Sequence, residues 1–337
     1  MWPLSHFLVC LLLITVHAYG WRGSAWRGSH KHATRTLNSD VATGLHMRSY
    51  GAPCKSRSRS SFYSVHSNAY HTSLKSSKSS EGSPIAVLLR TQNVIPTIVL
   101  NTLGGLMQRK DWRHLMSVDM IKAHMISVFI AFASCVVNDI VDMDVDKLNK
   151  PDNPLATGRT SVPMAYFLTF VFFFLPYWIS RSMTPSVSFL TESSVVLLLL
   201  YTPIFKKIIV VKNLTCSFVI ANTILLAATC FLSNTGQIFK GLASFNVIGK
   251  WCKIFSLCNT SAKMTFMSVF TRIFSRELEF DIRDVKGDAQ MNIYTIPVAL
   301  GVDASKMIVQ VCDWIWKSLL GGAVIVWLSR LPSGMAL

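Results

Sequence analysis

Long apolar runs constrain the fold of this chain more than any other feature of its sequence. Seven runs approach the ~20 residues that a helix needs to cross a bilayer. Only 15% of the 337 residues are charged, against roughly 25% in soluble domains. The sequence therefore predicts an all-α fold, a polytopic transmembrane helical bundle. The expected spans are 85–107, 115–137, 162–180, 187–205, 214–233, 264–279 and 305–329.

The N-terminal quarter of the chain has a different composition. Residues 7–18 (FLVCLLLITVHA) are apolar but too short to span a membrane, and they predict a signal-peptide-like segment over 1–19. Residues 20–83 are Ser-rich and hold ten Lys or Arg against two acidic residues, a composition typical of a disordered transit peptide. A secretory signal or type II anchor with a disordered tail stays open as an alternative. The membrane domain is expected over 84–337.

These two segments together resemble the bipartite presequences of proteins sent to plastids bounded by extra membranes. The sequence thus predicts a multi-pass protein of a plastid membrane, with the endomembrane system or the mitochondrion as alternatives. The net charge of +16 does not predict a nucleic-acid partner, because half of it lies in this transit-like segment. The eight cysteines are scattered without a CxxC pair, so neither a zinc site nor a disulfide framework is indicated.

An acidic run, NDIVDMDVD (138–146), directly follows the second apolar span. Within it, Asn138, Asp142 and Asp146 recur at i, i+4 and i+8, so they lie on one face of a helix. A calcium loop starting at Asp142 is disfavoured, because its sixth position is Lys147 instead of Gly. A solvated helix end is the ordinary alternative for one such run.

A second acidic run, FDIRDVKGD (280–288), follows the sixth apolar span. Asp281, Asp284 and Asp288 recur at i, i+3 and i+7, again on one helical face. Two facing carboxylate clusters repel each other unless a cation lies between them, and Mg²⁺ prefers such oxygen ligands together with phosphate oxygens. An ion relay in a transporter is the competing interpretation, but relay acids usually lie within a span.

A basic turn, IFKKIIVVKN (204–213), lies between the two acidic runs in sequence. Counting spans places all three segments on one side of the membrane. Lys206, Lys207, Lys212 and Arg276 are then candidates to neutralise a diphosphate held by the metal.

Four segments of the chain resemble those of the UbiA-type intramembrane prenyltransferases. NDIVDMDVDKLNKPDNPLATG (138–158) is similar to the first signature of that family, and RELEFDIRDVKGDAQMNIYTIPVALG (276–301) to its second. YTPIFKKIIVVKN (201–213) is similar to the loop that carries Tyr, Pro, Lys and Lys-Asn, and LLRTQNVIP (88–96) to the opening helix. The four motifs occur in the family's order.

The resemblance implies nine transmembrane helices around a cavity that opens sideways to lipid, and Mg²⁺ bridging the acidic motifs and an isoprenyl diphosphate. By the same resemblance, the expected metal ligands are Asn138, Asp142, Asp146, Asp281, Asp284 and Asp288. Asp142, Asp146, Asp281 and Asp288 are expected to be catalytic. The implied diphosphate contacts are Arg90, Asn93, Tyr201, Lys206, Lys207, Lys212 and Arg276.

The chain also departs from the family pattern. Asn153 stands in KPDNP where the family typically has Arg, and Arg159 is a candidate substitute. Phe280 precedes Asp281 where Lys or Asn is common. One span follows the second motif where the family has about three, which predicts a C-terminally truncated chain. Residues 236–263 fit poorly and are either an interfacial amphipathic segment or mistranslated sequence.

The predicted activity is Mg²⁺-dependent transfer of a polyprenyl group from an isoprenyl diphosphate to a lipophilic or aromatic acceptor within reach of the bilayer. The plastid prediction favours an aromatic acceptor of quinone or tocopherol pathways, or a chlorophyll pathway. The alternatives are an inactive or truncated paralogue, a glycerol-phosphate lipid prenyltransferase, and an ion-coupled transporter.

Overall fold

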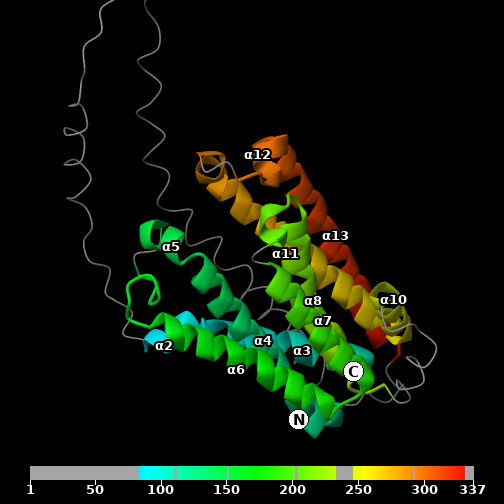
Figure 1. The fold of residues 1–337 in the computed structure, drawn as a ribbon. Helices are drawn as coiled ribbons and strands as arrows, with labels where there is room; N and C mark the ends of the chain where they lie inside the picture. The colour runs from blue at the N-terminus through cyan, green and yellow to red at the C-terminus, as the bar shows by residue number, and fades with distance from the viewer. Residues whose placement is uncertain are drawn as a thin grey trace, which may run out of the picture. The chain divides into compact units, whose positions relative to one another are not determined.

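The computed structural model of the chain describes residues 83–109, 112–149, 152–201, 204–232, 246–290 and 293–330. The predicted signal-peptide-like segment lies outside the described residues, as does the transit-like segment up to residue 82. Within the described residues the regular structure is entirely helical (Figure 1). The all-α prediction is therefore confirmed.

The helices alternate with short turns and three 3₁₀ segments, η2 (Thr91–Asn93), η3 (Trp112–Met116) and η4 (Phe205–Lys207). In chain order the α-helices are α2 (Pro84–Leu88), α3 (Val94–Gln108), α4 (Val118–Val141), α5 (Met143–Asn149), α6 (Val162–Arg181), α7 (Pro185–Tyr201), α8 (Val211–Thr229), α10 (Val247–Leu257), α11 (Thr260–Gln290), α12 (Ile296–Leu300) and α13 (Val302–Leu328).

All seven predicted spans overlap helical structure, and four of the corresponding helices, α4, α6, α8 and α13, are long and apolar enough to cross a membrane. The other three differ from the prediction. The expected span 85–107 is broken, because Arg90 adopts a left-handed backbone conformation (φ 49°) between α2 and α3. α7 has only 17 residues. α11 has 31 residues and extends well past 264–279, so the second acidic motif lies within the helix.

Local sequence signals explain several helix ends. Ser117 and Ser161 cap α4 and α6, accepting from the backbone N–H of the residue three positions later at 3.2 and 3.4 Å. Pro176 lies inside α6, where a membrane helix tolerates it because neighbouring groups satisfy the freed carbonyl. Gly301 separates α12 from α13 with φ +87°, a conformation that strains any residue with a Cβ.

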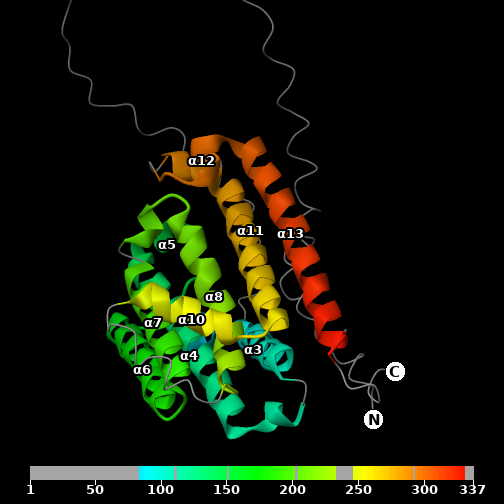
Figure 2. The same ribbon diagram turned by 90° about the vertical axis from the view of Figure 1, so that its right-hand side faces the viewer.

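The helices pack as a chain of neighbours. α4 packs against α6, α6 against α7, and α7 against α8. α8 contacts both α3 and α11, and α11 packs along α13. The two ribbon views agree that α11 and α13 run side by side, joined through α12 (Figure 2). This order places the basic turn before α8 between the helices that carry the two acidic motifs.

The main apolar cluster lies where α3, α8, α10, α11 and α13 meet. The fully buried side chains of Leu106, Ile224 and Ile254 belong to it, and the indole N–H of Trp327 donates to the Leu106 carbonyl at 2.9 Å. The outward faces of α6 and α13 are also apolar; Trp178 and Trp314 are 67% and 72% exposed. Such faces fit lipid, which does not drive apolar side chains inward as water does.

Part of the segment that fits the family poorly, 236–263, forms α10. Asn246 caps this helix by accepting from the Gly249 N–H at 2.7 Å. Ile254 on one face is fully buried, whereas Ile248 on another is 79% exposed. The structure thus supports the interpretation of an amphipathic segment for 247–257. Residues 236–245 lie outside the described part of the chain.

Candidate active site

The first acidic motif lies at the junction of α4 and α5. Asp142 ends α4, yet helical hydrogen bonds continue through it, from the Asp142 N–H to the Asn138 carbonyl (2.9 Å) and from the Asp146 N–H to the Asp142 carbonyl (2.7 Å). The backbone therefore keeps Asn138, Asp142 and Asp146 in the predicted i, i+4, i+8 register.

Lys206, in η4, reaches this motif from the turn between α7 and α8. Its ammonium nitrogen lies 2.5 and 2.6 Å from the two carboxylate oxygens of Asp142. The side chains of Lys206 and Asp142 are 33% and 20% exposed, so water screens this pair only partly.

The second acidic motif lies in the C-terminal part of α11, where Asp281 faces the first turn of α8. The Lys212 ammonium donates to one carboxylate oxygen of Asp281 at 2.5 Å, and the Asn213 amide donates to the other at 2.9 Å. Asp281 is almost completely buried. The segment 204–213 therefore contacts both acidic motifs, which confirms that the three predicted segments meet at one end of the bundle.

Asp139 is a buried carboxylate that sequence reasoning did not assign. The Arg90 guanidinium donates to it at 2.7 Å. The left-handed turn at Arg90 places this side chain beside α4, so Arg90 is engaged with the first motif. Asp139 is the second residue of the motif NDIVDMDVD, but the sequence alone does not show what it contacts. The packing of α2 near α4 reveals that its partner is Arg90.

Asn153 takes the place next to Asp146. Its amide nitrogen donates to Asp146 Oδ2 at 2.8 Å, and its amide oxygen accepts from the Leu155 N–H at 2.9 Å. Arg159, the candidate substitute, is exposed and donates to the Thr157 hydroxyl (3.2 Å) and to the Asp152 carbonyl. The contact to the acidic motif thus comes from Asn153.

The rest of the second motif is more exposed. Asp284 faces outward, and the Asp288 carboxylate accepts from the Thr295 hydroxyl at 3.3 Å. Burial raises the pKa of the Asp288 carboxyl above its ordinary value, and the nearby Lys212 charge lowers it by less. Phe280, which departs from the family pattern, stacks with the guanidinium groups of Arg276 and Arg283, at 5.1 and 4.2 Å from its ring centre.

Three further residues were predicted to contact the diphosphate: Tyr201, Asn93 and Lys207. Tyr201 is the last residue of α7 and is partly buried. Asn93 is exposed immediately before α3. The side chain of Lys207 lies outside the described part of the structure.

The carboxylates do not form a closed metal cage. Within the described ranges, no group of three or more His, Cys, Asp or Glu side chains is close enough to hold a metal ion. Instead, each motif presents a carboxylate held by a lysine. Mg²⁺ is usually bound by one or two carboxylates together with substrate phosphates and water, so the donor set fits that ion in chemistry.

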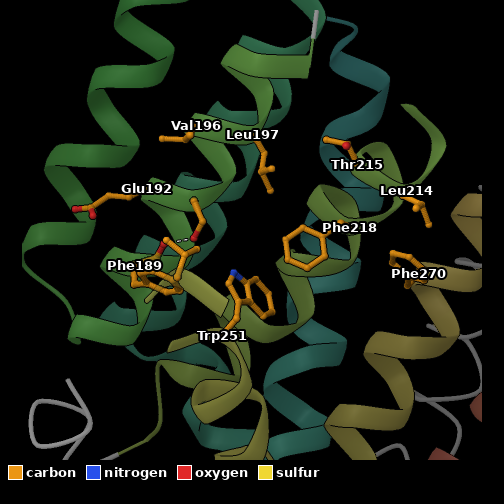
Figure 3. A pocket seen from close by; sticks show the side chains of 11 residues that line it. Phe189, Glu192, Val196, Leu197, Leu214, Thr215, Phe218, Trp251 and Phe270 are labelled. Atoms are coloured by element: carbon orange, nitrogen blue, oxygen red, sulfur yellow. Dashed lines mark hydrogen bonds between the residues drawn. The ribbon is translucent and has the colours of Figure 1, made fainter. Parts of the chain in front are cut away.

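A cavity of about 610 Å³ is lined by side chains of α7, α8, α10 and α11 (Figure 3). Leu197 lies one turn before Tyr201 on α7, and Phe270 lies eleven residues before Asp281 on α11. Eleven residues are about three turns, so Phe270 and Asp281 share one face. The helix faces that carry the polar site also line the cavity.

Comparison with known proteins gives consistent matches. The sequence model of the UbiA prenyltransferase family matches residues 98–337. The chain is 28% identical to the digeranylgeranylglyceryl phosphate synthase of Sulfurisphaera tokodaii over 64% of this chain and 69% of that protein. It is 29% identical to the Sulfolobus acidocaldarius protein of the same name, over 60% of this chain and 62% of that protein. The chain thus spans under seven-tenths of these relatives.

Solved structures share the fold. The apo UbiA homolog from Aeropyrum pernix K1 superposes with a TM-score of 0.54 at 17% identity, over 72% of this chain and 82% of that one. A UbiA homolog from Archaeoglobus fulgidus bound to GPP and Mg²⁺ gives 0.52 at 16% identity, over 75% and 81%.

Proposed function

This chain belongs to the UbiA prenyltransferase family, and from that premise we propose that it transfers a polyprenyl group from an isoprenyl diphosphate to a glycerol-phosphate lipid. The observation that carries the proposal is the placement of the segment 204–213. Lys206 contacts Asp142 of the first acidic motif, and Lys212 contacts Asp281 of the second.

This arrangement suits a diphosphate. Two lysine ammonium groups and two acidic motifs at one end of the bundle supply donors for phosphate oxygens and ligands for the cation that accompanies them. Asn138, Asp142, Asp146, Asp281, Asp284 and Asp288 are the residues proposed to hold Mg²⁺. When bound, Mg²⁺ supplies further stabilisation of the charge on the leaving diphosphate. The Archaeoglobus homolog was solved with GPP and Mg²⁺, which supports this assignment.

The residues of this chain act mainly through charge. Lys206 and Lys212 turn from their carboxylate partners to the diphosphate and stabilise the negative charge that develops on it. The allylic C–O bond breaks, and its electron pair leaves with the diphosphate. A C–O bond forms to the acceptor hydroxyl, whose proton is released. The apolar cavity beside the site keeps water from the allylic cation.

The acceptor class is proposed from the relatives. The two sequence relatives described above are named digeranylgeranylglyceryl phosphate synthases, and that product is a glyceryl phosphate carrying two geranylgeranyl groups. We therefore place a glyceryl phosphate bearing one such group ahead of the aromatic acceptors that the sequence alone favoured. An aromatic acceptor stays the second candidate.

The test uses membranes that contain the chain, with Mg²⁺ and labelled geranylgeranyl diphosphate. Geranylgeranylglyceryl phosphate, homogentisate, 4-hydroxybenzoate and a naphthoate are offered in turn. A labelled ether product with the glyceryl phosphate is expected, and Asp142→Ala abolishes it. Asp303→Ala is the matched control, because Asp303 is a solvent-exposed carboxylate at the start of α13. Product formed only with an aromatic acceptor would contradict the proposed glyceryl phosphate acceptor. Absence of product with every acceptor would contradict the proposed prenyltransferase activity.

The domain limits and the compartment are also proposals. Residues 84–337 would form the prenyltransferase domain, and residues 1–83 would direct it to a plastid membrane. Fusing 1–83 to a fluorescent protein tests this: plastid fluorescence is expected, and secretion or mitochondrial import contradicts it.

A further inference from the structure

We propose that α10 closes the far end of the prenyl-chain cavity, and that Trp251 on this helix sets the longest isoprenoid chain that the protein accepts. The inference rests on the proposed function, because it assumes that a diphosphate is held at the Lys206–Lys212 end. It concerns a helix whose sequence fits the family pattern poorly and to which the proposed chemistry gives no role.

The cavity shares helix faces with the polar site, and its lining is apolar except for Glu192, Ser193 and Thr215. Tyr201 and Leu197 follow one another by one turn on α7, and Phe270 lies about three turns before Asp281 on the same face of α11. A chain attached to a diphosphate at Lys212 therefore has the walls of α7 and α11 to follow. The cavity volume of about 610 Å³ lies within the ~300–1,000 Å³ usual for ligand pockets.

The depth of the wall matches a particular chain length. Twelve residues separate Tyr201 from Phe189 at the far end of α7, and eleven separate Asp281 from Phe270. At ~1.5 Å per residue both walls are about 17 Å long. An extended amino-acid residue has three chain atoms and spans ~3.5 Å. An isoprene unit has four chain atoms and is therefore about a third longer than a residue, so about four units fill this depth. Four units make a geranylgeranyl group.

Trp251 lies at the far end of the cavity, away from Leu197 and Thr215 (Figure 3). Its ring centre is 4.5 Å from that of Phe218 and 6.2 Å from that of Phe266. The three rings come from α8, α10 and α11, and together they form an aromatic floor. A longer chain that follows the walls of α7 and α11 meets this floor.

Separate contacts hold α10 in place. Ile254 is fully buried in the main apolar cluster. The turn after α10 is bound to the end of α3, because the Asn259 amide donates to the carbonyls of Met107 (2.7 Å) and Gln108 (2.9 Å). A helix fixed at both its face and its end provides a rigid stop.

A neighbouring cavity is unsuited to hydrocarbon. A second cavity of about 400 Å³ shares Phe189 and Glu192 with the first and adds Arg181 and Lys250. Arg181 pairs with Glu192 at 3.3 Å. An isoprenoid chain that entered this space would desolvate charged groups without replacing their partners, which is unfavourable.

The test compares donors of increasing length: geranyl, farnesyl, geranylgeranyl and hexaprenyl diphosphate. Thermal stabilisation by each donor is measured in Mg²⁺ buffer alongside turnover. Trp251→Ala is expected to raise use of hexaprenyl relative to geranylgeranyl diphosphate at least about tenfold, since one further buried isoprene unit is worth several methylene transfers. Ser193→Phe, which fills the cavity above the floor, shifts preference to farnesyl or geranyl diphosphate. Trp314→Ala, an exposed Trp on α13, leaves the profile unchanged.

The outcomes separate this inference from the proposed function. An unchanged donor profile in both Trp251→Ala and Ser193→Phe, with geranylgeranyl transfer retained, overturns the chain-length stop alone. If Trp251→Ala loses stability, Ser193→Phe still decides the question. A wild-type chain that neither binds nor consumes any donor overturns the proposed function instead.

Discussion

Four buried or partly buried aspartates in the part of the chain that the structure describes each have a nitrogen partner. Burying a charge is costly unless it is paired and hydrogen-bonded, so these pairs fix where the motifs lie. They are Asp139 with Arg90, Asp142 with Lys206, Asp146 with Asn153, and Asp281 with Lys212 and Asn213. The lysines occupy positions from which they can turn to a phosphate, whereas the amides of Asn153 and Asn213 only orient the carboxylates.

Replacing Lys212 by Gln tests the lysine role. The change keeps much of the side-chain length but removes the charge, so the rate of prenyl transfer should fall about 10²–10³-fold, as when one preorganised donor to a developing anion is lost. Lys306→Gln is the matched control, because Lys306 is an exposed lysine paired with Asp303. Initial rates of the purified proteins are compared. A Lys212→Gln rate within twofold of the wild-type rate would contradict the role.

Asn153 and Arg159 are distinguished by their contacts. Asn153→Ala removes a donor from the buried Asp146 carboxylate, so the free energy of unfolding should fall by about 1–3 kcal/mol. Arg159→Ala removes an exposed side chain and should change it by less than about 0.5 kcal/mol. Thermal unfolding in detergent measures both. Equal effects from the two changes would refute the assignment of Asn153 as the partner of Asp146.

At the scale of elements, close helix contacts and one polar network set the packing. α3 and α8 approach at Gly104, where an added Cβ would lie 2.3 Å from the Ile224 carbonyl oxygen. Small residues at such crossings let membrane helices meet closely. α11 and α13 are joined at Asp313, which accepts from the Ser275 hydroxyl of α11 at 3.2 Å and pairs with Arg272 of α11 at 3.5 Å. These two junctions fix α8 and α11, the helices that carry Lys212 and Asp281.

A pair of glycine substitutions tests the α3–α8 contact. Gly104→Ala forces two backbones apart and should lower stability by about 1–3 kcal/mol or more, as overpacking does. Gly321→Ala, on α13 where nothing lies within 4 Å of the added Cβ, should leave stability unchanged or raise it, because Ala is the better helix former. Melting temperatures in detergent give the comparison. Similar melting temperatures for the two variants would contradict the close approach.

For the membrane domain as a whole, two acidic motifs far apart in sequence meet through one short basic turn. Lys206 pairs with Asp142, at the end of α4, and Lys212 pairs with Asp281 of α11, so charge pairs from this one turn link the two helices. We propose that the same two lysines also bind the diphosphate of the substrate, in addition to their structural pairing with the carboxylates.

Metal removal tests the structural role of the lysine–carboxylate pairs separately from the proposed role of the metal in prenyl transfer. Excess chelator should abolish prenyl transfer, because the diphosphate loses its divalent cation. The melting temperature should change little, because the lysine–carboxylate pairs remain. Added Mg²⁺ should restore turnover. Transfer that continues in excess chelator would contradict the metal assignment, and a collapse of the melting temperature would contradict the lysines' structural role.

The sequence by itself determined the helical class, the approximate positions of seven apolar helical segments, four of which form helices long and apolar enough to cross a membrane, and the two acidic motifs with the basic turn between them. These features follow from local periodicity, since apolar length and i, i+4 spacing need no knowledge of distant residues. That is why Asp142, Asp281, Lys206 and Lys212 were predicted correctly to lie at one end of the bundle.

Only the tertiary structure decided which groups touch. Arg90 with Asp139, Asn153 with Asp146, and the placement of α10 under the cavity depend on which helix faces meet. Many arrangements satisfy the same apolar pattern in lipid, because lipid and neighbouring helices are similarly apolar. The break at Arg90 likewise required a left-handed turn that periodicity does not encode. Side-chain partners are therefore set by packing and hydrogen bonding between segments, which the order of residues along one helix cannot specify.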